Sequence, residues 1–276
     1  MLLDREDVRR AFGEDEFFPL FQPQVNLKTG RLAGFEVLAR WRHARLGSIP
    51  PDAFIPLVLR HGFINSLTQR LLGKTFAASS LLPNALRLSI NIAPIQLLDT
   101  TIPGRIAEAA GEGGFPLERL TIELTECALF EDLSLAQSVA GELKALGCRL
   151  SLDDFGNGES SLFHLEKLPF DELKVDRSFI AAMTGSPGSR KIVAAVIGLG
   201  KSLGMTTVAE GVENETQAAA MRAMGCALAQ GWHFGRPAPA EEIPRMVAAA
   251  RGTCARVLTF VEDESVDAEA ACTVEA

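Results

Sequence analysis

Strand-like and helix-like hydrophobic patterns alternate along most of the chain. Runs of strand length are predicted at Phe17–Leu27, Leu32–Trp41, Arg87–Ala93, Leu120–Leu124, Arg149–Asp153, Glu172–Val175, Thr206–Ala209 and Ala227–Gln230. Helical patterns lie between them, for example at Ser66–Leu82, Leu133–Leu146, Ser189–Leu203 and Glu215–Met224. Three of these helices end just before a glycine, as helices closed by a C′ glycine do: Gly147, Gly204 and Gly225. Eight strands with intervening helices predict a (β/α)8 barrel.

The first two strands do not fit the repeating unit. Four residues, 28–31, separate them, which predicts an antiparallel hairpin. We therefore predict an α/β fold, a TIM-like barrel with one reversed strand at the N-terminal hairpin. An open doubly wound sheet is the alternative, although no G-x-G-x-x-G sequence follows the first strand. Residues 1–13 are interpreted as a lead-in, 14–251 as the barrel domain and 252–276 as an acidic tail that we expect to be flexible.

Polar residues alternate with aliphatic ones inside several predicted strands, whereas fully buried parallel strands usually read as continuous apolar runs. Neighbouring residues of a strand point to opposite sides, so aliphatic residues that face the helices leave the polar ones facing the barrel interior. Residues at the carboxyl ends of barrel strands converge on one site. The polar residues on this inward parity or at these strand ends are Glu36, Arg40, Asn91, Glu123, Asp153, Lys174, Glu210 and Gln230.

Several carboxylates that face one another repel strongly unless a cation neutralises them. All-oxygen ligands favour hard ions such as Mg²⁺ or Mn²⁺ over zinc. Asp153 and Asp154 are adjacent, so both reach one site only where the pleat of the strand ends, and there one of them could bridge two metal ions. A two-metal site suits phosphodiester hydrolysis. Each acid taken singly is as well explained as a solvated strand end or a helix N-cap, but recurrence on several strands favours a site.

With these residues the sequence resembles the EAL-domain phosphodiesterases of cyclic di-GMP signalling. The segments that carry the resemblance are FQP (21–23), EVLARW (36–41), SIN (89–91), ELTE (123–126), DDFG (153–156), KVD (174–176), AEGVE (209–213) and QGWHFGRP (230–237). The resemblance covers roughly residues 17–246. It implies a reversed-strand barrel, two Mg²⁺ or Mn²⁺ ions per site, and hydrolysis of cyclic di-GMP to linear pGpG. It also makes a homodimer our expectation.

The resemblance also implies a role for each matching residue. The implied ligands of a first metal ion are Glu36, Asn91, Glu123 and Asp153. The implied ligands of a second ion are Asp153, Asp154 and Glu210, of which Glu210 would also act as the base. Lys174 would orient or deprotonate the attacking water. The implied substrate contacts are Gln22, Arg40 and Gln230, with Arg40 at a phosphate, and Glu126 would anchor the loop after Asp154.

That loop departs from the family pattern. Asn157 stands in place of a threonine and Glu159 in place of an aromatic residue. We expect the charge of Glu159 in place of an aromatic ring to affect the catalytic rate and its regulation more than the type of reaction catalysed. Two other functions stay open: a receptor that binds cyclic di-GMP without hydrolysing it, and an interaction scaffold that binds no nucleotide. Degenerate family members usually lose a metal-ligand or lysine position, and every one of these positions is kept here, which favours the enzyme.

Composition excludes other classes of protein. With 47% hydrophobic and 22% charged residues, the chain is neither disordered nor collagen-like. The net charge of −8 argues against a binder of duplex nucleic acid. The first residues have no apolar stretch behind their charges, and the longest uncharged run, 223–235, is too short to cross a bilayer. We therefore expect a cytoplasmic protein without a membrane segment, and any sensory or cyclase domain or partner to lie outside this sequence.

Overall fold

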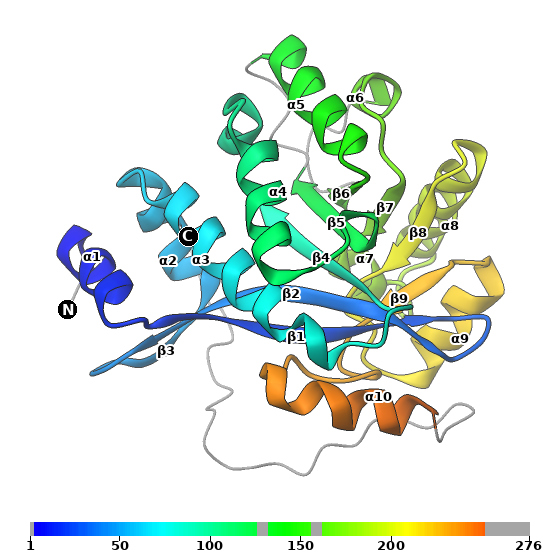
Figure 1. The fold of residues 1–276 in the computed structure, drawn as a ribbon. Coiled ribbons are helices and arrows are strands. Elements are labelled where there is room, and N and C mark those ends of the chain that lie inside the picture. The colour runs from blue at the N-terminus through cyan, green and yellow to red at the C-terminus, as the bar shows by residue number, and fades with distance from the viewer. Residues whose placement is uncertain (1–2, 126–131, 156–161, 252–276) are drawn as a thin grey trace, which may run out of the picture.

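One sheet of nine strands forms the centre of the molecule (Figure 1). The computed structural model describes residues 3–125, 132–155 and 162–251. The strands are β1 (Phe17–Asn26), β2 (Leu32–His43), β3 (Gly47–Ile49), β4 (Arg87–Ile92), β5 (Leu120–Thr125), β6 (Arg149–Phe155), β7 (Glu172–Val175), β8 (Thr206–Ala209) and β9 (Leu228–Gln230). The α-helices are α1 (Arg5–Gly13), α2 (Pro51–Arg60), α3 (Ile64–Ala77), α4 (Ile102–Gly113), α5 (Leu133–Ala145), α6 (Leu162–Lys167), α7 (Arg177–Ala182), α8 (Pro187–Ser202), α9 (Glu215–Met224) and α10 (Ile243–Arg251).

The sheet closes into a barrel. Its strands follow the order β1, β9, β8, β7, β6, β5, β4 and β2, and β2 pairs with β1 to complete the ring. β1 is antiparallel to both of its neighbours, β2 and β9. The other pairs of the ring are parallel. The reversed-strand barrel is therefore confirmed, and the open doubly wound sheet is wrong because β1 joins the two edges.

The predicted elements are confirmed with small changes at their ends. All eight predicted strands are present, and α9 has the predicted bounds. The predicted helix over Ser66–Leu82 begins earlier, at Ile64, and finishes as a 3₁₀ turn over Ala78–Leu81. β3, which pairs with the far end of β2, was not predicted because three residues carry no periodic signal.

Local side-chain chemistry explains where the helices begin and end. The Asn214 side chain accepts a hydrogen bond from the Gln217 amide and so caps the N-terminus of α9. Gly225 ends the same helix with a left-handed φ of 75°, which suits a residue without a Cβ. Gly147 and Gly204 have φ values of 96° and 72° after α5 and α8. The predicted C′ glycines are confirmed at these three positions.

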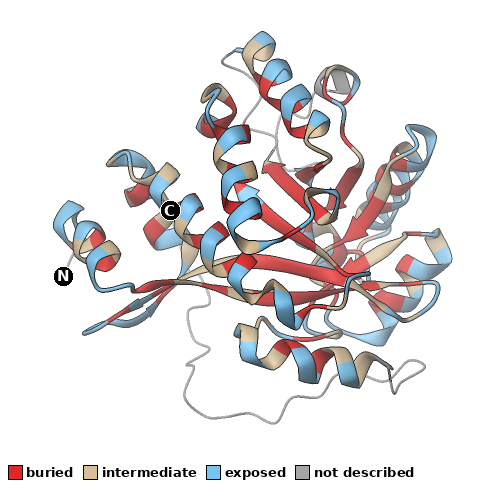
Figure 2. Ribbon diagram, viewed as in Figure 1, coloured by how far each residue is buried: buried red, intermediate tan, exposed pale blue. Residues whose placement is uncertain are grey.

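Aliphatic side chains on the outward face of the strands bury themselves under the helices. Leu120, Ile122 and Leu124 of β5 have no exposed surface, and burial of each contributes roughly 1.5–3 kcal/mol. The inward residues between them, Thr121 and Glu123, are equally buried. Figure 2 shows barrel strands that are buried almost throughout and helices whose outer faces are exposed. The apolar layer outside the sheet therefore leaves the barrel interior to polar side chains.

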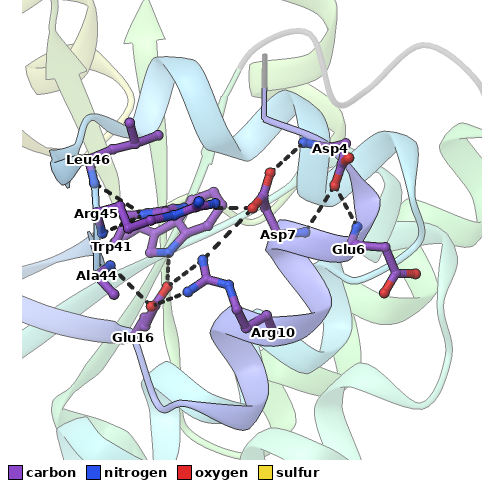
Figure 3. Close-up of polar contacts among 10 residues, drawn as sticks. Asp4, Glu6, Asp7, Arg10, Glu16, Trp41, Ala44, Arg45 and Leu46 are labelled. Carbon is purple, nitrogen blue, oxygen red and sulfur yellow. Dashed lines mark hydrogen bonds and ion pairs between the residues drawn. The ribbon is translucent and has the colours of Figure 1, made fainter. Parts of the chain in front are cut away.

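A buried glutamate attaches the first helix to β2 (Figure 3). Glu16 accepts hydrogen bonds from Trp41 Nε1 at 2.8 Å, from Arg10 Nη1 at 2.7 Å and from the Ala44 amide at 3.2 Å. Burial alone would raise the pKa of Glu16, but the hydrogen bonds, that of Trp41 first, outweigh it and lower the pKa. The predicted lead-in, residues 1–13, thus contains a helix that is bonded to the barrel.

None of the helices in the described part of the chain combines the length and the apolar character that a membrane-spanning segment needs. The predicted acidic tail, residues 252–276, lies outside the described residues.

We predict that Glu16→Gln lowers the free energy of unfolding by about 2 kcal/mol at pH 7, the scale of hydrogen bonds to a charged group. Because the folded pKa lies below the ordinary value of 4.5, this stabilisation exists above that pH and is lost as the pH falls through the folded pKa. Urea denaturation at pH 7 and below pH 4 measures both effects. Glu14→Gln, at an exposed neighbour, is the matched control and should change little. A difference between Glu16→Gln and wild type that grows on acidification would contradict the assignment.

Candidate active site

A fully buried lysine lies among four carboxylates that come from four other strands or strand ends. The Lys174 side chain, on β7, has no exposed surface. Its Nζ lies 2.9 Å from Glu123 Oε2 and 3.0 Å from Asp153 Oδ2. Glu36 Oε1 lies 3.7 Å from the same nitrogen, which also contacts Glu210 Oε1. The convergence that the inward parity predicts is therefore present.

The cluster holds more negative charge than the lysine neutralises. Burial alone would lower the pKa of Lys174, but the surrounding carboxylates, Asp153 and Glu123 first, raise it well above its ordinary value. The carboxylates thus favour the charged form of Lys174. Burial raises the pKa of Glu210 to about 8, with Lys174 opposing and Asp153 adding to the rise. Burial, followed by repulsion from Glu36, raises the pKa of Glu123 well above its ordinary value.

Two groups of carboxylates have the geometry of metal ligands. The first group is Glu36, Glu123 and Asp153, and the second is Asp153, Asp154 and Glu210. Within each group, one oxygen from every residue lies within 4.8 Å of the others, and Asp153 belongs to both. Among the described residues, Glu123 Oε1 is buried without a hydrogen-bond partner. An orphaned buried oxygen beside an excess of negative charge is what a hard cation would satisfy, so the donor set fits such an ion.

A local break in β6 lets two consecutive aspartates reach one site. Asp154 has a left-handed φ of 55°, and the pairing of β6 with β7 shifts register between Leu152 and Phe155. The Asp154 amide donates to Asp153 Oδ1 at 2.8 Å. Partial burial raises the pKa of Asp154 to about 6, and the Asp153 carboxylate adds to the rise. The pleat was expected to end between these residues, but it is only interrupted there, because β6 continues to Phe155, which pairs with Val175.

Neutral amides donate to both carboxylate oxygens of Glu36. Asn91 Nδ2 donates to Glu36 Oε1 at 2.9 Å, and Gln230 Nε2 donates to Glu36 Oε2. Gln230 Nε2 also donates to Gln22 Oε1 at 3.1 Å, while Gln24 Nε2 donates to Gln230 Oε1 at 3.1 Å. Sequence reasoning missed Gln24. The alternation of Gln22 and Gln24 on one face of β1 was the signal that could have found it.

Arg40 lies on β2 beyond Glu36 and is partly buried. Its Nη1 donates to the Ala39 carbonyl at 2.8 Å. Burial lowers the pKa of Arg40, and the nearby Glu36 carboxylate opposes this shift. An arginine keeps its charge under such a shift, so a cation stands near the carboxylate cluster, and its contact with a phosphate stays a prediction.

Three positions singled out from the sequence lie outside the described residues. They are Glu126, Asn157 and Glu159. The anchoring role of Glu126 and the effects of the two loop departures therefore stay predictions. The roles of the residues that the structure does bring together also stay predictions, since their geometry fits those roles without testing them.

The EAL domain family matches residues 5–237, which is most of the chain and includes every residue of the cluster. The chain belongs to the EAL domain family. An uncharacterized signaling protein of Caulobacter vibrioides is 40% identical over 237 residues, which are 86% of this chain and 29% of that protein. The cyclic di-GMP phosphodiesterase RocR of Pseudomonas aeruginosa is 34% identical over 236 residues, which are 84% of this chain and 60% of RocR.

Solved structures agree with the fold of this EAL domain. The PaMucR phosphodiesterase in complex with c-di-GMP superimposes with a TM-score of 0.82 at 32% identity, covering 86% of this chain and 98% of that one. The chain spans less than two thirds of the length of the Caulobacter protein and of RocR. What those longer proteins do as wholes therefore concerns this EAL domain only as a proposal.

We predict that Mg²⁺ raises the melting temperature of the metal-free EAL domain by several degrees. An ion at about 100 times its Kd adds roughly 2.7 kcal/mol to folding stability, and each kcal/mol is about 2–4 °C in a domain of this size. Glu123→Gln should abolish most of the increase, because it replaces a ligand oxygen next to the orphaned one. Glu142→Gln, at an exposed position of α5, should keep the increase. Thermal melts of each protein with chelator and with Mg²⁺ measure this increase. An equal rise in melting temperature in both variants would contradict the metal assignment.

Proposed function

We propose that this EAL domain hydrolyses cyclic di-GMP to linear pGpG with two Mg²⁺ or Mn²⁺ ions. The observation that carries the proposal is the carboxylate cluster, in which two ligand groups share Asp153 beside a buried Lys174. Support also comes from the name of RocR as a cyclic di-GMP phosphodiesterase and from the similarity to the PaMucR complex with c-di-GMP.

Two sets of oxygens would hold the ions. The residues for a first ion are Glu36, Asn91, Glu123 and Asp153, and those for a second are Asp153, Asp154 and Glu210. Bound ions of this kind lower the pKa of a coordinated water and stabilise charge on the phosphate and the leaving oxygen. Asn91 donates to Glu36 through its amide nitrogen, so its carbonyl oxygen is left for a cation.

Lys174 and Glu210 would handle the proton of the attacking water. The raised pKa of Lys174 favours its ammonium form, which would orient the water by hydrogen bonding, whereas deprotonation of the water by Lys174 would need the neutral amine. Glu210 contacts Lys174 Nζ through Oε1 and, in its ionised form, would take the proton. The proton would then be held by Glu210 in its buried contact with Lys174. Gln22 and Gln230 line the site on the side of the reversed strand. Arg40 contributes a positive charge that would attract a phosphate group of the substrate.

Four further expectations from the sequence are also proposals. They are the homodimer, the cytoplasmic location, the division into lead-in, barrel and tail, and input from a sensory or cyclase domain or partner. A receptor that binds cyclic di-GMP without turnover would show metal-dependent binding and no pGpG, so product chromatography after incubation with cyclic di-GMP and Mg²⁺ separates it from the enzyme.

We predict that removal of any one ligand of the first ion abolishes hydrolysis through lost metal affinity. The four variants are Glu36→Ala, Asn91→Ala, Glu123→Ala and Asp153→Ala. The measurement is pGpG formation against Mg²⁺ concentration, with thermal melts to verify folding. Glu142→Ala is the control for loss of an exposed carboxylate. Turnover at the wild-type rate in all four folded variants would refute the site.

We predict that Lys174→Ala lowers the maximal rate by at least about 10²-fold, the usual scale for a group that handles a proton in the transition state. Metal-dependent nucleotide binding should stay near the wild-type level, because Lys174 is not an expected substrate contact. Calorimetry and product formation on the same preparation measure both. Lys191→Ala, at an exposed lysine of α8, is the control. A large loss of affinity with an unchanged maximal rate would instead make Lys174 a substrate clamp.

A further inference from the structure

An exposed tryptophan follows directly on the last strand of the barrel. The Trp232 side chain is 56% exposed, whereas Trp41 is fully buried. Within the described part of the chain, the other large hydrophobic side chains that stand exposed are aliphatic. Trp232 lies two residues after Gln230, which hydrogen-bonds Glu36 of the carboxylate cluster. A large aromatic surface is therefore exposed to solvent two residues from a side chain that contacts the carboxylate cluster.

The turn that carries Trp232 is held rigidly. Gly231 has a φ of 152°, and a Cβ at this position would lie 2.2 Å from the Val212 carbonyl oxygen, so glycine is required. The His233 amide donates to that same oxygen at 3.0 Å. Gln22 Nε2 donates to the Gly235 carbonyl at 3.3 Å. The backbone around Trp232 is thus tied both to the segment after β8 and to the glutamines beside the cluster.

Arg236 lies over the indole ring of Trp232. Its guanidinium carbon is 4.9 Å from the ring centroid, a cation–π geometry that restricts the orientation of the ring. Both side chains are exposed. The pair joins a flat aromatic surface to a positive charge, which is the chemistry that single-stranded nucleotides meet on proteins: a base stacks on the ring and a phosphate approaches the cation.

We propose that Trp232 and Arg236 form a stacking platform for one purine base of the dinucleotide, so that the substrate is selected by its base as well as by its phosphodiester. This inference rests on the proposed function and adds a specificity-determining pair to it. Tryptophan and arginine also dominate protein–protein interfaces. The proximity of the turn to Gln22 and Gln230 favours the nucleotide, and an interface is the alternative that the experiment must detect.

Steady-state kinetics with cyclic di-GMP test the platform. Trp232→Ala should raise KM by roughly 5- to 150-fold, the scale of base–aromatic stacking, and leave kcat within about twofold. Trp232→Phe keeps a ring and should restore most of the affinity. Leu203→Ala is the matched control. It removes another exposed apolar side chain, 47% exposed, from the residue after α8, just before the amino end of β8. Arg236→Ala should raise KM less than Trp232→Ala.

Two further measurements isolate the base. Bis(p-nitrophenyl) phosphate offers a phosphodiester without a purine, and its smaller rings stack less well, so its KM should rise much less in Trp232→Ala than the KM for cyclic di-GMP does. Linear pGpG should quench the fluorescence of the exposed tryptophan in wild type, and the quenching should disappear in Trp232→Phe, where the buried Trp41 remains.

An unchanged KM for cyclic di-GMP in Trp232→Ala, with wild-type turnover intact, overturns the platform and leaves the proposed function standing. A change of oligomeric state on size-exclusion chromatography with an unchanged KM makes Trp232 an interface residue and also overturns the platform. Wild-type protein that neither binds nor hydrolyses cyclic di-GMP overturns the proposed function itself, and the platform with it.

Discussion

Repulsion among buried carboxylates is the interaction on which the rest of the site depends. Glu36, Glu123, Asp153 and Glu210 all lie against one ammonium group, that of Lys174. Isolated charges in a barrel interior are costly, and a single lysine leaves a net negative charge. The cluster therefore persists because the strands that carry it are fixed from outside by their aliphatic faces. The same excess of charge is what makes the site suited to hard cations.

The reversed strand changes what surrounds this cluster. In β1, Gln22 lies opposite Glu36 and Gln24 opposite Gln230, so two amides of one strand meet the neighbouring strands on both sides. Both amides hydrogen-bond to Gln230, which in turn donates to Glu36, and because amides carry no net charge they do not add to the repulsion. The antiparallel hairpin is where this barrel departs from the regular repeat. It thus places uncharged side chains beside the acidic cluster.

Local patterns in the sequence were enough to predict the eight strands of the ring, its closure and most of the cluster. Period-two alternation fixes which side chains face inward, and Lys174 and Glu123 could be assigned from it without knowledge of their neighbours. The features that were missed depend on contacts distant in sequence. Glu16 accepts a hydrogen bond from Trp41, which lies 25 residues further along the chain. Gln24 reaches the site only through its hydrogen bond to Gln230, near the other end of the chain. The left-handed backbone of Asp154 was anticipated only as the end of the pleat, whereas β6 continues to Phe155 after a register shift against β7.

β2 connects the attachment of the first helix to the cluster. Glu36 and Arg40 lie on this strand, and Trp41, the residue after Arg40, donates its indole hydrogen to Glu16. Trp41 is fully buried against Phe17 and Phe54, with ring centroids 5.2 Å and 5.9 Å away. Interiors packed in this way transmit strain instead of absorbing it. A loss of the Glu16 hydrogen bonds would therefore disturb the strand that carries a candidate metal ligand and a candidate phosphate contact. The stability of the attachment of α1 and the geometry of the site both depend on β2.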